Sequence, residues 1–139
     1  MGGGLDRWLA ISDGANAALH AVAYAASADG PVSARAAAEA IGVSPTYLAK
    51  LVQGLARAGL VDISRGTTGG FSIVGDPAAM SALDVITAVD GGLPRRYCLF
   101  PKAACRTRGC RLKRLCDDVA ARAEAALRET SIAELAGNY

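Results

Sequence analysis

Several residue types and patterns are scarce in this chain of 139 residues. Phe, Trp and Tyr together make up only 5% of it, and it contains a single histidine. It has no run of about 18 apolar residues, because Asp, His and Gly interrupt the alanine-rich segments, and this argues against a membrane-spanning helix. It also lacks a Ser/His/Asp set and a phosphate-cradling glycine loop ahead of a helix. We therefore expect no enzyme and no small-molecule substrate.

We expect no targeting signal at the amino terminus. Residues 1–8 lack the basic and apolar blocks of a secretory leader, and Asp6 stands where a myristoylation motif has Ser or Thr. We expect a cytoplasmic protein with a flexible arm over residues 1–8. Structural disulfides are rare in a reducing cytosol, so the four cysteines between residues 98 and 116 require a metal or redox explanation.

The net charge is small, and the basic residues are unevenly distributed along the chain. The net charge is only +2, yet eight of the fifteen Lys and Arg residues lie between Arg95 and Arg114, a stretch without Asp or Glu. The rest of the chain has seven basic residues against thirteen acidic ones. The length and the hydrophobic content of 52% are sufficient for one core, so we expect one structural domain overall.

Three helices are predicted in the first half of the chain. The first is expected over about residues 12–28, before Asp29-Gly30-Pro31. Capping serines and closing glycines place the other two at about 33–42 and 44–58, and Pro45 takes the first position of the third helix. The second and third helices are joined by a glycine-containing turn of about three residues. This arrangement is typical of a helix-turn-helix, whose second helix enters the major groove of DNA.

The third helix is expected to read DNA. Apolar residues recur on one face at i, i+3, i+4 and i+7, from Leu48 to Leu55, and this face belongs to the core. A polar opposite face is usual in any amphipathic helix, but the helix-turn-helix context favours contact with bases or phosphates. The candidate residues near its start are Ser44, Thr46, Tyr47 and Lys50.

A small β-wing is predicted after this helix. Apolar residues near positions 61 and 73 indicate two short strands, and residues 65–70 form a glycine- and threonine-rich tip between them. Such a tip can approach a phosphate backbone or a narrow minor groove. The candidate DNA contacts in it are Arg65, Thr67 and Thr68.

The carboxy-terminal half is predicted to be helical. A helix capped by Ser81 ends at Gly91, and a long helix runs from about Cys110 to Thr130. Its apolar stripe suggests dimerisation and comprises Leu112, Leu115, Val119, Ala123 and Leu127. The expected fold is mainly α with a two-stranded wing: a winged helix-turn-helix DNA-binding region over 9–90, a cysteine-rich loop over 91–111, and a dimerisation helix with a carboxy-terminal turn over 112–139.

The order of these segments resembles a known group of transcription regulators, the Rrf2 family, which includes IscR, NsrR and RirA. The matching motifs are VSPTYL at 43–48, LARAGLV at 55–61, RG at 65–66 with TGGF at 68–71, VITAVDG at 85–91 and SIAEL at 131–135. The resemblance implies a homodimer with crossing long helices that binds a palindromic double-stranded DNA operator. It also implies an iron-sulfur cluster, 2Fe-2S or 4Fe-4S, that senses redox, nitric oxide or iron status.

The cysteine segment is the expected cluster site. Six, four and five residues separate Cys98, Cys105, Cys110 and Cys116, so none forms the Cys-x-x-Cys knuckle common in structural zinc sites. A cluster on several thiolates is anionic, and the surrounding cations would offset its charge. Zinc, a bare thiol switch, and a basic patch that simply faces solvent or phosphate remain alternatives. An electron-transfer protein is a further one.

The fourth ligand is open. The resemblance implies that Cys98, Cys105 and Cys110 bind the cluster, but Lys113 stands where some relatives carry a ligating histidine. Cys116 lies on the apolar stripe, where it is either a packing residue or a ligand. The only histidine, His20, lies on the first helix, from which some relatives supply a ligand to the cluster of the partner subunit. Asp13 and Asn16 are weaker candidates on the same helix.

Overall fold

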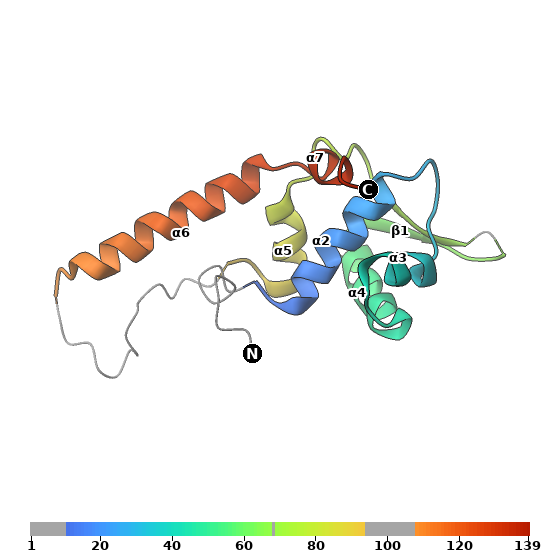
Figure 1. The fold of residues 1–139 in the computed structure, drawn as a ribbon, viewed down its shortest axis with the longest axis horizontal. Coiled ribbons are helices and arrows are strands. Elements are labelled where there is room, and N and C mark those ends of the chain that lie inside the picture. Colours follow the sequence, from blue (N-terminus) through green and yellow to red (C-terminus); the bar gives the residue numbers. More distant parts are fainter. Residues whose placement is uncertain (1–10, 68, 94–107) are drawn as a thin grey trace.

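The structure, a computed structural model, describes residues 11–67, 69–93 and 108–139. The predicted arm, Thr68, Cys98 and Cys105 lie outside these residues. Helices α2 (Asp13–Ala26), α3 (Ala34–Ile41) and α4 (Pro45–Arg57) form the first half of the fold (Figure 1). Each begins after a serine whose hydroxyl accepts a hydrogen bond from a backbone N–H in the first turn. The three predicted helix starts are confirmed, and Ser12 caps its helix as Ser33 and Ser44 do.

The turn between α3 and α4 is the expected helix-turn-helix turn. Gly42 ends α3 in the left-handed region, with φ of 76°, and its N–H donates to the carbonyl of Ala38. This conformation suits glycine because a Cβ would be strained there. Two residues later Ser44 caps α4, with Pro45 at its first position. The tight turn fixes the direction in which α4 leaves α3.

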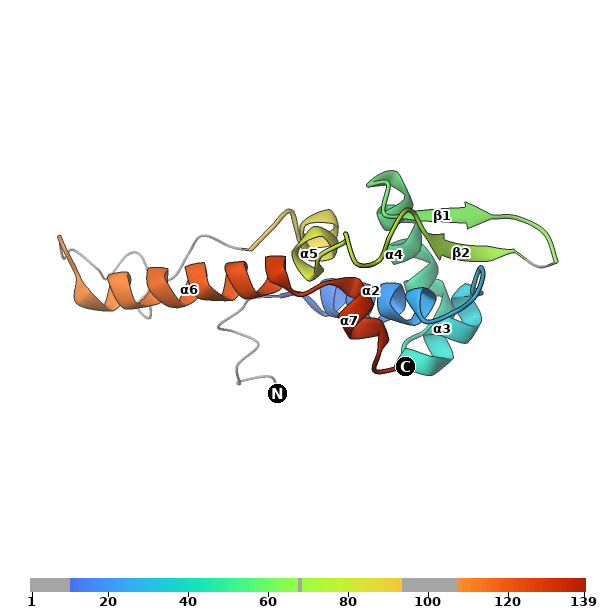
Figure 2. The ribbon, with the colours of Figure 1, turned by 90° about the horizontal axis from the view of Figure 1, so that it is seen from above.

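The wing is a two-stranded antiparallel sheet of β1 (Val61–Ser64) and β2 (Gly70–Ile73), as predicted. Val61 pairs with Ile73 and Ser64 with Gly70, and the hairpin projects beyond the helices (Figure 2). Its base is tied to the segment before α3, because Val32 and Phe71 exchange two backbone hydrogen bonds of 2.9 and 2.8 Å. A Cβ on Gly70 would lie 2.2 Å from the Val32 carbonyl oxygen, so this approach requires glycine.

The carboxy-terminal half consists of α5 (Ala82–Asp90), α6 (Arg111–Glu129) and the short α7 (Ile132–Ala136). Both views show α6 extending away from the rest of the described structure (Figures 1 and 2). After α6 the chain returns to the core, where the Ile132 N–H donates to the Met80 carbonyl at 2.8 Å. Helix α7 then packs against α2.

One core joins these elements, and α2 lies at its centre, in contact with α3, α4, α5, α7 and β2. The buried face of α2 is mostly alanine, which lets neighbouring elements approach its backbone closely. The largest fully buried side chains come from five different parts of the chain: Val22, Leu48, Leu55, Phe71, Val85, Ile86 and Ile132. In the described ranges, no helix is both long and apolar enough to cross a membrane.

Candidate functional site

The start of α4 presents polar side chains to solvent. Ser44, Thr46 and Lys50 are exposed there, at the helix end where unpaired N–H groups carry partial positive charge. Ser44 is also the cap, since its hydroxyl accepts from the Tyr47 N–H at 3.2 Å. This surface has the chemistry expected for contact with phosphates and base edges.

Tyr47 is placed differently from its neighbours. It is 39% exposed, but its hydroxyl reaches the first turn of α2. A Cβ added at Gly14 would lie 3.3 Å from the Tyr47 hydroxyl oxygen and 3.5 Å from Leu51 Cδ2. Glycine at position 14 thus allows α4 to approach α2 closely at this point.

The wing presents the second group of candidate DNA contacts. Arg65 and Thr67 are both exposed, and no hydrogen bond is found for either side chain within the part of the wing that the structure describes. The Ser64 hydroxyl donates to the Gly70 carbonyl at 3.4 Å and helps to close the hairpin just before this tip. The Arg65 guanidinium is therefore available for a groove or a phosphate.

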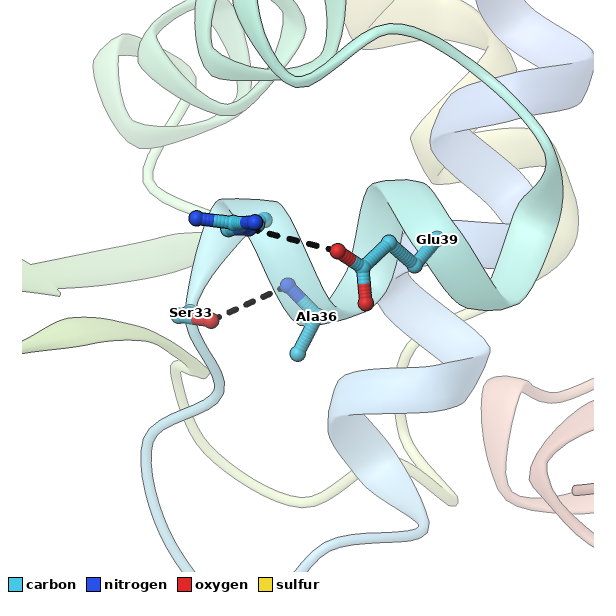
Figure 3. A network of polar contacts seen from close by, with 4 residues as sticks. Ser33, Ala36 and Glu39 are labelled. Atoms are coloured by element: carbon cyan, nitrogen blue, oxygen red, sulfur yellow. Dashed lines mark hydrogen bonds and ion pairs between the residues drawn. The ribbon is translucent and has the colours of Figure 1, made fainter.

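The start of α3 adds a polar network close to the wing base (Figure 3). The Ser33 hydroxyl accepts from the Ala36 N–H at 3.0 Å, and Arg35 Nε lies 3.2 Å from Glu39 Oε1. Both charged side chains are mainly in solvent, so this pair contributes little to stability. Arg35 is accordingly a weaker source of phosphate contact than Arg65.

Two of the four cysteines lie in the described structure, one just before α6 and one within it. Cys110 is the residue before the helix, is half-buried, and makes no side-chain capping hydrogen bond. Cys116 is buried, with 5% of its surface exposed. The two are six residues apart, a rise of about 9 Å along a helix. Within residues 11–67, 69–93 and 108–139, no group of three His, Cys, Asp or Glu side chains is placed to hold a metal ion.

The amino-terminal end of α6 is unusually basic. Arg108, Arg111 and Arg114 are exposed around Cys110, and the first turn contains no acidic residue. The partial positive charge of a helix start normally favours acidic side chains, so cations are unfavourable there unless an anion is bound nearby. The residues at this end therefore suit an anionic group, such as a thiolate or a thiolate-bound cluster.

Helix α6 also has an uncovered apolar stripe. Leu112, Leu115 and Val119 are 40%, 52% and 40% exposed, whereas Cys116 and Ala120 form the buried side of the helix. At 3.6 residues per turn these five residues lie on one face of α6. Cys116 and Ala120 are buried within the chain, whereas Leu112, Leu115 and Val119 beside them face solvent in the single protomer.

His20 lies on the exposed side of α2 and contacts the end of the chain. Its Nδ1 shares a hydrogen bond with the Tyr139 hydroxyl, and the Tyr24 ring packs edge-on against Tyr139. Partial burial raises the pKa of Tyr139 above its ordinary value. Asn16 and His20 line a hollow of about 340 Å³ between α2 and α7. The structure thus places Nδ1 of this candidate ligand against Tyr139, which leaves Nε2 for any other partner.

One long-range contact was missed by the sequence analysis. Asp90, the last residue of α5, accepts two hydrogen bonds from Ser12 at the start of α2. Ser12 was recognised only as the start of a helix and Asp90 only as part of a motif. Their separation of 78 residues gives no local signal that they meet.

Known proteins share this architecture. The profile of the Rrf2 family, described as an iron-dependent transcriptional regulator, matches residues 11–138. The chain is 33% identical over 112 residues to the HTH-type transcriptional regulator IscR of Yersinia pseudotuberculosis, covering 81% of this chain and 68% of that protein.

Solved structures agree with this match. IscR of T. potens superposes with a TM-score of 0.73 at 25% identity, over 92% of this chain and 86% of that one. CymR, the global cysteine regulator of B. subtilis, shares the fold with a TM-score of 0.74 at 24% identity, over 93% and 97% of the two chains. The relatives are transcription regulators rather than enzymes, as expected. The chain therefore belongs to the Rrf2 family of winged-helix transcription regulators.

Proposed function

We propose that this regulator controls operator binding through an iron-sulfur cluster bound by its cysteine segment. The observation that carries the proposal is the basic start of α6. Cys110 lies there with Arg108, Arg111 and Arg114 around it, in a first turn without acidic residues. An anionic group at this position interacts favourably with both the helix end and the cations. The family description as iron-dependent supports an iron-containing group.

The proposed ligands are Cys98, Cys105 and Cys110. A bound cluster would supply a centre whose charge and integrity change with redox state, nitric oxide or iron supply. In the proposal these thiolates would share one cluster, and the Lys and Arg residues of the same sequence segment would offset its charge.

Two residues are proposed as alternatives for the fourth ligand. Cys116 lies on α6, six residues after Cys110, but its buried position also suits a packing role. In His20, Nδ1 contacts Tyr139, so Nε2 is the nitrogen available for ligation. A hydrogen bond at one ring nitrogen is the usual way to orient a histidine that ligates through the other. In the proposal His20 would ligate the cluster of a partner subunit.

The proposed DNA interface combines the start of α4 with the wing. Its residues are Ser44, Thr46, Tyr47, Lys50, Arg65, Thr67 and Thr68. Lys50 and Arg65 supply charge for phosphate or groove contact, and the smaller hydroxyl residues supply hydrogen bonds. We propose that a second copy covers the stripe of Leu112, Leu115 and Val119, because burial of these exposed side chains favours association. Two-fold symmetry then doubles the interface on a palindromic operator.

The test is anaerobic purification followed by visible absorbance and by iron and acid-labile sulfide analysis. The proposal expects a broad iron-sulfur absorbance band that is lost in Cys98→Ser, Cys105→Ser and Cys110→Ser. Cys116→Ser and His20→Ala identify the fourth ligand, because only a ligand variant should lose the band. A matched control is Arg57→Ala, an exposed cation on α4 outside the cysteine segment. Wild-type protein that lacks both iron and labile sulfide would contradict the proposal.

A cluster-free regulator that uses zinc or a thiol switch is the second candidate. The fold shared with CymR, a cysteine regulator, and the partial exposure of Cys110 favour it. It predicts colourless protein that contains zinc or reactive thiols, so the same preparation separates the two candidates.

A further inference from the structure

A two-point contact joins the end of α5 to the start of α2. The Ser12 N–H donates to Asp90 Oδ2 at 2.9 Å, and the Ser12 hydroxyl donates to Asp90 Oδ1 at 2.5 Å. Both oxygens of one carboxylate are thus engaged by one residue, and hydrogen bonds to a charged acceptor are stronger than neutral ones. We refer to this contact as the Asp90–Ser12 clasp.

The clasp is part of the cap of α2. The Ser12 hydroxyl also accepts from the Ala15 N–H at 3.0 Å, so the same oxygen caps the helix and binds Asp90. The carboxylate lies at the end of α2 where partial positive charge favours an anion. Asp90 therefore ties the first turn of α2 to the end of α5.

The first turn of α2 in turn contacts the recognition helix α4. The position of a Cβ on Gly14 is surrounded by the Tyr47 hydroxyl, Leu51 Cδ2 and the Ser12 hydroxyl at 3.3 to 3.5 Å. Tyr47 and Leu51 belong to α4, whereas Ser12 belongs to the clasp. A shift of this turn toward α4 would press its backbone against Tyr47, and a shift away from α4 would leave a gap there.

The clasp also borders the cysteine segment in sequence. Asp90 ends α5, and Gly91 and Gly92 follow with φ of 77° and 112°, ahead of Cys98. A change in that segment can therefore act on the end of α5. The clasp is a contact within the described residues that joins this end of α5 to α2.

We infer that the Asp90–Ser12 clasp couples the cysteine segment to the DNA-reading helix. Asp90 and Ser12 are positioning residues: they touch neither a cluster nor DNA in this inference, and they act through Gly14 and Tyr47. The inference rests on the proposed function, because the signal is a change in the cluster. The contact between α5 and α4 through the clasp, in contrast, is expected in the protein without a cluster.

The test compares Asp90→Asn with the matched control Asp84→Asn. Asp84 is on the same helix and also accepts a hydrogen bond from a serine N–H, that of Ser81 at 2.8 Å, but it belongs to the capping box of α5. Asp90→Asn keeps the shape of the side chain but removes one of the two acceptor oxygens. Full-length wild type and both variants are prepared with and without the cluster.

Two readouts decide the outcome. Hydrogen exchange in cluster-free protein without DNA should be at least threefold faster at the start of α4 in Asp90→Asn, and unchanged there in Asp84→Asn. The ratio of operator affinities with and without the cluster should fall toward one in Asp90→Asn and persist in Asp84→Asn. Unchanged α4 exchange in Asp90→Asn, or a preserved ratio, overturns the coupling. A wild-type ratio of one contradicts the proposed function instead, and the exchange measurement still decides whether the clasp holds α4.

Discussion

Replacing Gly70 with alanine is expected to detach the wing from the helices. A Cβ at this position would lie 2.2 Å from the Val32 carbonyl oxygen and 2.6 Å from its carbonyl carbon. These are backbone atoms, which cannot move aside as the end of a flexible side chain can. The clash between the added Cβ and the Val32 backbone can be relieved only if β2 and the Val32 segment separate.

The size of the effect follows from the contacts at this point. Separation breaks the two hydrogen bonds between Val32 and Phe71. Each contributes a net stability of about 0.5 to 1.5 kcal/mol, so the loss is about 1 to 3 kcal/mol. Phe71 is only 1% exposed, and a shift of its backbone loosens core packing as well. At about 4 °C per kcal/mol for a domain of this size, Tm should fall by about 4 to 12 °C.

Thermal unfolding followed by circular dichroism measures this loss, and operator titration measures its effect on DNA binding. Gly30→Ala is the control, since a Cβ at Gly30 meets no atom within 4 Å. We expect Gly30→Ala to retain both properties. If Gly70→Ala unfolds at the wild-type temperature, the wing is not anchored through Val32 and the reasoning is refuted.

Three further predictions concern the wing, the dimer and a helix cap. Arg65→Ala should weaken operator binding by about 1 to 3 kcal/mol in fluorescence anisotropy, and equal binding would remove Arg65 from the interface. Leu115→Glu should give monomers in sedimentation velocity, whereas Ala121→Glu, also exposed on α6, should not; a dimeric Leu115→Glu protein would place the interface elsewhere. Hydrogen bonds from the Ser131 backbone and hydroxyl lower the pKa of Glu134 below its ordinary value. The stability that the carboxylate contributes is therefore present above the ordinary pKa and lost as the pH falls through the lowered pKa. Glu134→Gln should therefore be less stable than wild type in denaturant titrations at neutral pH, with a difference that shrinks in acid; a constant difference would argue against the capping carboxylate.

Local signals were sufficient to predict most of the fold. Ser12, Ser33, Ser44 and Ser81 each cap the helix that the sequence places after them, because a hydroxyl that accepts a first-turn N–H depends on a few neighbouring residues. The change in apolar period after α4 likewise marks the two strands. Such features need no knowledge of distant segments.

Contacts between distant segments were not predictable in the same way. Nothing local pairs Ser12 with Asp90, and the polar-face pattern of α4 does not indicate that the Tyr47 hydroxyl reaches Gly14. Periodicity places Cys116 and Leu115 on the same apolar stripe of one helix, but tertiary packing buries Cys116 and leaves Leu115 exposed. Cys98 and Cys105 lie outside the described residues, so their assignment rests on the sequence and on family membership.

The most direct test of the central claim compares operator affinity before and after the cluster is removed from one anaerobic preparation. Coupling between two sites typically changes affinity by about 5- to 150-fold. The account predicts a change of at least about fivefold, in either direction, with iron and sulfide lost in parallel. Equal affinity of the loaded and stripped protein for the same operator would contradict it.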